Sequence, residues 1–166
     1  MALTDPGRPR DISSPLFLQR YALATLYYST AGDDWKPCLG CNPNARPFLS
    51  EAHECLWVGV MCLGTGKVLA IDFLEEDIGM SGPLPDEIRL FDSLTRLALP
   101  NNKITDIPMS IAYTPIVELE VSNNEISSLP TSLYGKRSLE KLHIDRNNFE
   151  GPLPDFVAIP KLEHNQ

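Results

Sequence analysis

The side chains of this 166-residue chain with the greatest capacity for covalent bonding or metal binding are four cysteines. They stand in two pairs, Cys38 with Cys41 and Cys55 with Cys62. Four cysteines allow three disulfide connectivities, and the same sulfurs with His53 could instead hold zinc. The C-x6-C spacing is unusual for zinc, and no β-α-β pattern surrounds the C-x2-C pair, as a thioredoxin-like redox site would require. Disulfides are therefore favoured over zinc and over a redox pair.

A second group with possible chemistry consists of Glu120, His143 and Asp145. The alternation around Ile144 places His143 and Asp145 on one face of a strand, and Glu120 stands at the equivalent of His143 in the preceding segment. Such a group could hold a metal ion, but no nucleophile stands at an equivalent position and ligands on a flat sheet converge poorly. The chain also lacks a phosphate loop, H-E-x-x-H and G-x-S-x-G. We expect a solvated face, with no catalytic residue, no metal and no cofactor.

A sequence repeat determines which elements position these residues. The string Gly82-Pro83-Leu84-Pro85-Asp86 recurs 69 residues later at Gly151, which is three times a period of 23. The copies between them are defined by apolar residues and one asparagine. The best of these copies reads Leu94, Leu97, Leu99, Asn102, Ile104, Ile107 and Pro108. Copies start near residues 68, 94, 116 and 139, and a truncated fifth would start near Leu162.

The pattern L-x-x-L-x-L-x-x-N-x-L resembles the leucine-rich repeat family. The resemblance implies an α/β fold, a leucine-rich repeat solenoid or horseshoe with short parallel β-strands on its concave face. The residues agree, because apolar and exposed positions alternate in Leu97-Ala98-Leu99 and its equivalents, as in a half-buried strand. In the family the stacked asparagines satisfy backbone groups of adjacent turns. We expect such a ladder from Asn102, Asn124 and Asn147, with a plain turn-forming role as the alternative.

The residues before the repeats predict a cap. Helical spacing over residues 15–29 (Leu16, Ala22, Leu23, Leu26 and Tyr27) predicts a helix, with Ser14 as N-cap and Gly32 as stop. The pattern C-x-W-x-G-V-x-C at Cys55–Cys62 resembles the N-terminal cap of plant-type leucine-rich repeat proteins, receptor-like proteins among them, and of diatom proteins. The resemblance implies a Cys55–Cys62 disulfide, and a local Cys38–Cys41 disulfide is the pairing expected beside it. Crossed pairings are the alternative.

These patterns divide the chain into three parts. Residues 1–14 form a flexible N-terminal segment, residues 15–67 form the helix and cysteine cap, and residues 68–166 form about four repeats. No C-terminal cap is visible after the truncated fifth repeat, so we expect the chain to be the N-terminal part of a longer protein or a shortened gene product.

Composition narrows the function classes. The net charge is −8, which disfavours a nucleic-acid partner. No apolar run is long enough to cross a bilayer and no signal peptide precedes the repeats, so a membrane would be reached only through a segment outside this chain. Paired cysteines indicate an extracellular or membrane-tethered location facing the secretory lumen, with the cytoplasm as the alternative. The oligomeric state is unknown.

Binding is expected on the concave face. The strand register gives a mixed acidic and basic surface, which suits a protein or peptide with some positive charge. Its charged residues are Asp72, Glu75, Arg96, Glu118, Glu120, Lys141, His143, Asp145 and Arg146. The expected function is a non-catalytic protein-binding module, the N-terminal part of a receptor-like recognition protein. The alternatives are an intracellular scaffold, or the ectodomain fragment of a receptor-like kinase whose catalytic domain lies outside this chain.

Overall fold

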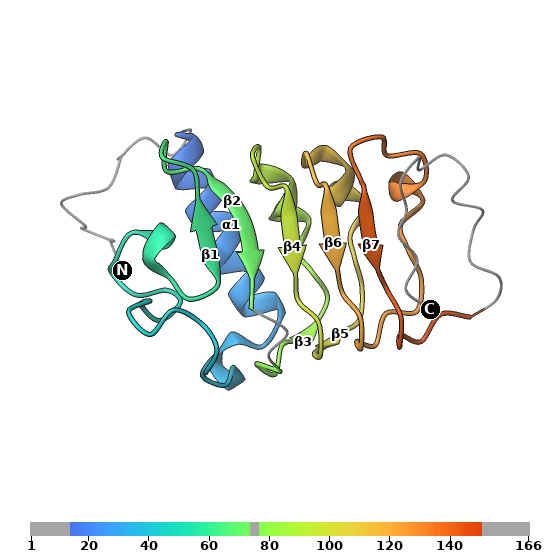
Figure 1. The fold of residues 1–166 in the computed structure, drawn as a ribbon, viewed down its shortest axis with the longest axis horizontal. Coiled ribbons are helices and arrows are strands. Elements are labelled where there is room, and N and C mark those ends of the chain that lie inside the picture. The colour runs from blue at the N-terminus through green and yellow to red at the C-terminus, as the bar shows by residue number, and fades with distance from the viewer. Residues whose placement is uncertain (1–13, 74–76, 151–166) are drawn as a thin grey trace.

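The structure, a computed structural model, describes residues 14–73 and 77–150 (Figure 1). One α-helix, seven short strands and five 3-10 helices follow one another along this part of the chain. The bounds are α1 Pro15–Ser29, β1 Val60–Cys62, β2 Val68–Asp72, β3 Ser81–Gly82, β4 Arg96–Ala98, β5 Lys103–Ile104, β6 Glu118–Glu120 and β7 Lys141–His143. The 3-10 helices are η1 Gly32–Asp34, η2 Glu54–Leu56, η3 Asp86–Leu90, η4 Met109–Tyr113 and η5 Thr131–Leu133.

The main sheet has the strand order β1-β2-β4-β6-β7, and a two-stranded sheet pairs β3 with β5 (Figure 1). The strands β2, β4, β6 and β7 are parallel, and each pairs with the strand one repeat further on. The expectation of short parallel strands is therefore confirmed for these four. The first strand, β1, pairs with β2 antiparallel, which the sequence patterns did not indicate.

The repeated leucines form the core between the strands and the 3-10 helices. Leu97, Leu119 and Leu142 lie directly opposite one another in the register, and all three are buried. The repeats of β2, β4 and β6 each return through a 3-10 helix that follows a proline, such as Pro108 before η4. Proline lacks the amide hydrogen needed for strand pairing, so the return path leaves the sheet there. Burying one apolar layer per repeat stabilises the stack, because no repeat could bury its apolar side alone.

Helix α1 covers the beginning of the stack. It spans the predicted residues and packs behind β1 and β2 (Figure 1), with Ala22, Leu23 and Leu26 fully or almost fully buried. Two details differ from the expectation. The Ser14 side chain makes no capping hydrogen bond, and the helix ends at Ser29 with Thr30 as its C-cap, before Gly32. Pro15 itself lacks one of the amide hydrogens that the first turn of a helix leaves without a partner.

An asparagine in each of the repeats that start near residues 94, 116 and 139 satisfies the backbone of its neighbours. The Asn124 side-chain oxygen accepts from the Ile104 amide at 2.9 Å, and its nitrogen donates to the Leu99 and Val121 carbonyls at 3.0 Å each. Asn102 accepts from Met80 N and Asn147 from Ile126 N in the same way. The side chains thus bridge successive turns, as a ladder requires and as a plain turn former would not.

Two disulfides hold the cap. Cys38 pairs with Cys41 and Cys55 with Cys62, with Cα–Cα distances of 5.4 and 5.6 Å. These are the two pairings that the sequence favours. None of the four sulfurs is a free thiol, whereas a zinc site would need thiolates.

Some sequence predictions lie outside the described residues. They concern the N-terminal segment up to residue 13, Glu75, and the truncated fifth repeat after residue 150.

Candidate binding face

The register of the main sheet places side chains of successive repeats in rows. We call the surface formed by these rows the strand face. One row runs through Met61, Ala70, Arg96, Glu118 and Lys141, and the next runs through Asp72, Ala98, Glu120 and His143. Side chains two apart along a strand point to the same face, so Ser122 and Asp145 continue the surface beyond β6 and β7.

A ladder of alternating charges crosses the strand face from β2 to β7. The Arg96 Nε lies 2.8 Å from an Asp72 carboxylate oxygen, and Arg96 also pairs with Glu118. The Lys141 ammonium lies 3.8 Å from the other Glu118 oxygen. Burial alone would lower the pKa of the Arg96 guanidinium, but its hydrogen bonds with Glu118 and Asp72 outweigh burial and raise that pKa. Opposite charges therefore tie the four parallel strands together.

A second polar cluster lies at the β6–β7 end of the strand face. One Glu120 oxygen accepts from the Ser122 amide at 3.0 Å, and the other lies 3.6 Å from His143 Nδ1. The Ser122 hydroxyl donates to Asp145 at 2.6 Å. The sequence pattern grouped Glu120, His143 and Asp145, and the structure brings these three side chains together through Ser122.

Parts of the face that were expected to be exposed are buried. Asp72 has only 8% of its side chain exposed because Arg96 lies against it. Ala70, Ala98 and Pro100 are buried as well. Arg146, by contrast, is 79% exposed and lies in a left-handed turn after β7. The accessible charges are therefore concentrated on β4, β6 and β7.

A buried polar hub, which the sequence patterns did not reveal, holds the cap onto the first strand. The Gln19 side chain donates to Glu54 and to the Gly66 carbonyl, and it accepts from the Val68 amide at 2.9 Å. Arg20 pairs with Glu54 at 3.2 Å and lies 4.5 Å above the Trp57 ring. The one available signal was a glutamine at a helix position that the apolar spacing predicts to be buried.

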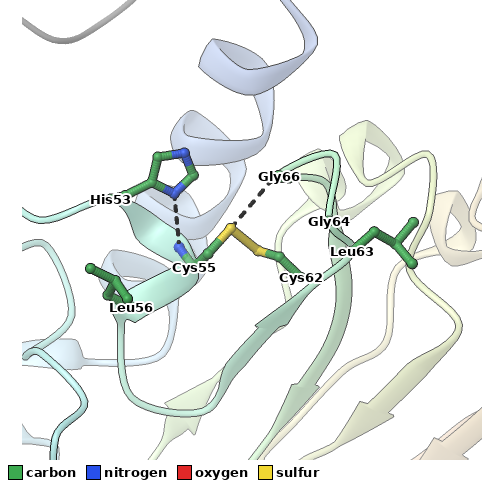
Figure 2. A pocket seen from close by; sticks show the side chains of 7 residues that line it. All are labelled: His53, Cys55, Leu56, Cys62, Leu63, Gly64 and Gly66. Atoms are coloured by element: carbon green, nitrogen blue, oxygen red, sulfur yellow. Dashed lines mark hydrogen bonds between the residues drawn. A yellow bond between two sulfur atoms is a disulfide. The ribbon is translucent and has the colours of Figure 1, made fainter.

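A shallow hollow of about 430 Å³ lies beside the Cys55–Cys62 disulfide. Figure 2 shows Leu56 and Leu63 on opposite sides of the disulfide, with His53 above it. The His53 Nδ1 accepts from the Cys55 amide at 3.2 Å, so this nitrogen is already used in the local turn. The hollow offers apolar walls and one imidazole, whose Nδ1 also lies 3.8 Å from a Glu54 carboxylate oxygen that Arg20 already pairs with.

Metal-binding clusters and membrane spans are the remaining features that bear on function. Within residues 14–73 and 77–150, no group of three or more His, Cys, Asp or Glu side chains is arranged to hold a metal ion. No helix in the same part of the chain is both long and apolar enough to cross a membrane.

Residues 92–149 match the family model described as leucine rich repeat. Among curated proteins, the chain is 30% identical over 124 residues to the receptor-like kinase TMK2 of Arabidopsis thaliana, covering 73% of this chain and 13% of that protein. It is 33% identical over 113 residues to pollen receptor-like kinase 2 of the same plant, covering 65% of this chain and 17% of that protein. The chain thus spans less than a fifth of the length of these relatives.

The chain is also similar to solved structures. The chain is similar to the PEPR1–AtPEP1 crystal structure, with 28% identity, a TM-score of 0.69, and coverage of 87% of this chain and 20% of that chain. It is also similar to the BIR2 ectodomain from Arabidopsis thaliana, with 27% identity and a TM-score of 0.57. That match covers 77% of this chain and 67% of the BIR2 chain.

Proposed function

This chain carries leucine-rich repeats, and we propose that it is a non-catalytic binding module that docks a protein or peptide on its strand face. The repeats form a solenoid whose inner, concave surface is that face. The observation that carries the proposal is the row of partly exposed charges on β4, β6 and β7, which the register holds at fixed spacing on a rigid sheet. Such pre-ordered polar groups suit recognition, because little side-chain freedom remains to be lost on binding.

The comparisons support the same proposal. The similar curated proteins are receptor-like kinases, and one similar solved structure is that of PEPR1 with AtPEP1. By this analogy the chain corresponds to a receptor ectodomain rather than to a kinase domain. Fold alone would not name a function, so the analogy adds weight only because the strand face offers accessible, ordered charges.

The disulfides favour an oxidising cellular compartment as the place where this function is carried out. Two disulfides in one cap persist only where the surroundings are oxidising. We therefore propose that the module faces the extracellular space or the secretory lumen. The cytoplasmic scaffold is disfavoured, because reduction there would remove both covalent links of the cap.

Charge reversal on the strand face tests the proposal. The double variant Glu118→Lys/Glu120→Lys should capture far less partner than the wild type when each is used as bait on the extracellular fraction of its host. The circular dichroism spectrum should not change, because both carboxylates are partly exposed. Capture is measured by quantitative mass spectrometry of the co-purified proteins.

The matched control is Glu125→Lys, which reverses an exposed acid in the turn after β6. It should capture partner as the wild type does. Equal loss in the control and in the double variant would indicate a general effect of net charge, and undiminished capture by the double variant would place the site elsewhere.

A further inference from the structure

The strand face ends in an apolar side chain at its β1 edge. Met61 lies opposite Ala70, which in turn lies opposite Arg96, so Met61 begins a row whose later members are charged. Its side chain is 48% exposed, whereas Ala70 is buried. An exposed methionine is a flexible apolar contact that adapts to the shape of a partner.

The other end of the strand face carries uncompensated negative charge. Glu118 lies between Arg96 and Lys141, and Asp72 is paired with Arg96. Glu120 differs, because among residues 14–73 and 77–150 no lysine or arginine lies within ion-pair distance of its carboxylate.

The groups that face Glu120 are polar rather than cationic. They are the Ser122 amide and the His143 imidazole, which is fully charged only when it is protonated. Nearby, Asp145 is contacted by Arg146 only at 3.9 Å. A lysine or arginine side chain from a partner would complete this cluster.

The strand spacing sets the distance between these two ends. Glu120 lies two residues further along β6 than Glu118, which belongs to the Met61 row, an offset that the long side chain of a lysine or arginine covers. Across the strands, three strand-to-strand steps separate β1 from β6, and at about 4.8 Å per step they span about 14 Å. An extended peptide crossing the strands advances about 3.3 Å per residue, so about four residues cover that span. An even spacing also keeps both side chains on the same side of an extended chain.

The direct line from Met61 to Glu120 crosses Ala70 and Ala98, whose side chains end at Cβ, with Arg96 and Glu118 beside it. We propose that the strand face binds an extended peptide in which an apolar side chain and a lysine or arginine stand four residues apart. The apolar side chain contacts Met61 and the cation contacts Glu120. This inference rests on the proposed function and adds the chemistry of the partner.

A peptide-display selection followed by binding measurements tests the spacing. A library of random twelve-residue peptides is first depleted of those that bind the Met61→Ser/Glu120→Gln variant. The remaining peptides are then selected for binding to the full disulfide-bonded chain. Enriched peptides should share an apolar residue and a basic residue at positions i and i+4, in either order. Synthetic versions should bind about tenfold more tightly, by fluorescence anisotropy, than peptides of the same composition with spacings of three or eight.

Single substitutions test the contact at each end of the strand face separately. Glu120→Gln should weaken the binding of the arginine peptide about fivefold and leave a peptide with glutamine in place of arginine unaffected. Met61→Ser should weaken the binding of the peptide that carries the apolar residue and leave a peptide that lacks this residue unaffected. Glu125→Gln should change the affinity of neither peptide. Affinity that does not depend on spacing, or a selection that enriches no peptide, would overturn the inference.

The two proposals fail in distinguishable ways. If charge reversal at Glu118 and Glu120 abolishes partner capture while spacing has no effect, the strand face still binds and only the two-point recognition is wrong. If neither experiment shows an effect, the strand face is not the binding site.

Discussion

At the scale of single residues, the ladder asparagines connect sequence to stability most directly. The Asn124 side chain is buried and serves four backbone groups in two repeats, the Ile104 amide and the Leu99, Val121 and Ser122 carbonyls. The Ile104 amide would otherwise be buried without a partner, which costs free energy. The asparagine therefore stabilises the contact between repeats rather than its own turn.

Asn124→Ala should lower the free energy of unfolding by about 2 kcal/mol, because the alanine leaves a buried amide and buried carbonyls without partners. Urea unfolding followed by circular dichroism measures the change. Ser127→Ala, an exposed substitution in the same repeat, should change stability by less than about 0.5 kcal/mol. Equal midpoints for the two variants would show that the ladder contributes little.

Residue types that repeat could be predicted from the sequence, and residues used once could not. The asparagine ladder and the buried leucines recur at a fixed period, so the period alone predicts their positions. Gln19 and Glu54 are 35 residues apart, and their contact depends on how α1 docks onto the cap. No local pattern encodes that docking, so the buried hub could not be predicted.

At the scale of elements, ion pairs join the cap to the first repeats. Lys67 in the β1–β2 hairpin lies 2.6 Å from Asp92, which follows η3, and Lys36 lies 2.7 Å from Asp77. The hydrogen bond with Lys67 is the main cause that lowers the pKa of the Asp92 carboxyl, and the bond with Lys36 lowers that of Asp77. Both pairs are largely exposed, so each contributes modestly.

Lys67→Met should therefore lower stability by less than about 1 kcal/mol at pH 7. A carboxyl whose pKa is lowered on folding stabilises the protein above its unfolded pKa, about 3.9 for aspartate. That contribution is lost as the pH falls through the lowered folded value. The stability difference between wild type and variant should thus shrink as the pH falls from about 5 to about 3.

Urea titrations at several pH values measure this difference. Arg137→Met is the control, because among the described residues no acid lies within ion-pair distance of Arg137, and its difference from wild type should not vary with pH in the same way. A Lys67→Met difference that stays constant down to pH 3 would contradict the role given to Asp92.

Strand order shows the limit of sequence patterns at this scale. The four parallel strands follow from the repeat, although β4, β6 and β7 begin one residue earlier than the apolar alternation indicated. The antiparallel strand β1 lies within the cysteine cap, where residues 60–62 carry no repeat signal. Its position matters for function, because it adds Met61 to the strand face.

At the scale of the whole molecule, the chain presents a rigid sheet on one side and 3-10 helices and α1 on the other (Figure 1). The sequence predicted strands on one side and a return path on the other, and it predicted a strand face with both acidic and basic residues. It did not predict which charges are accessible, because burial of Asp72 depends on the position of Arg96 across the strand boundary. The central claim is that partners bind the strand side.

A site-specific photo-cross-linker identifies the side of the molecule that a partner contacts. The cross-linking amino acid is placed either at Ser122, on the strand face, or at Ser127, on the return path of the same repeat. After irradiation with the partner, adducts are identified by mass spectrometry. We predict an adduct from position 122 and none from position 127. An adduct from position 127 alone, or equal yields from both positions, would contradict binding on the strand face.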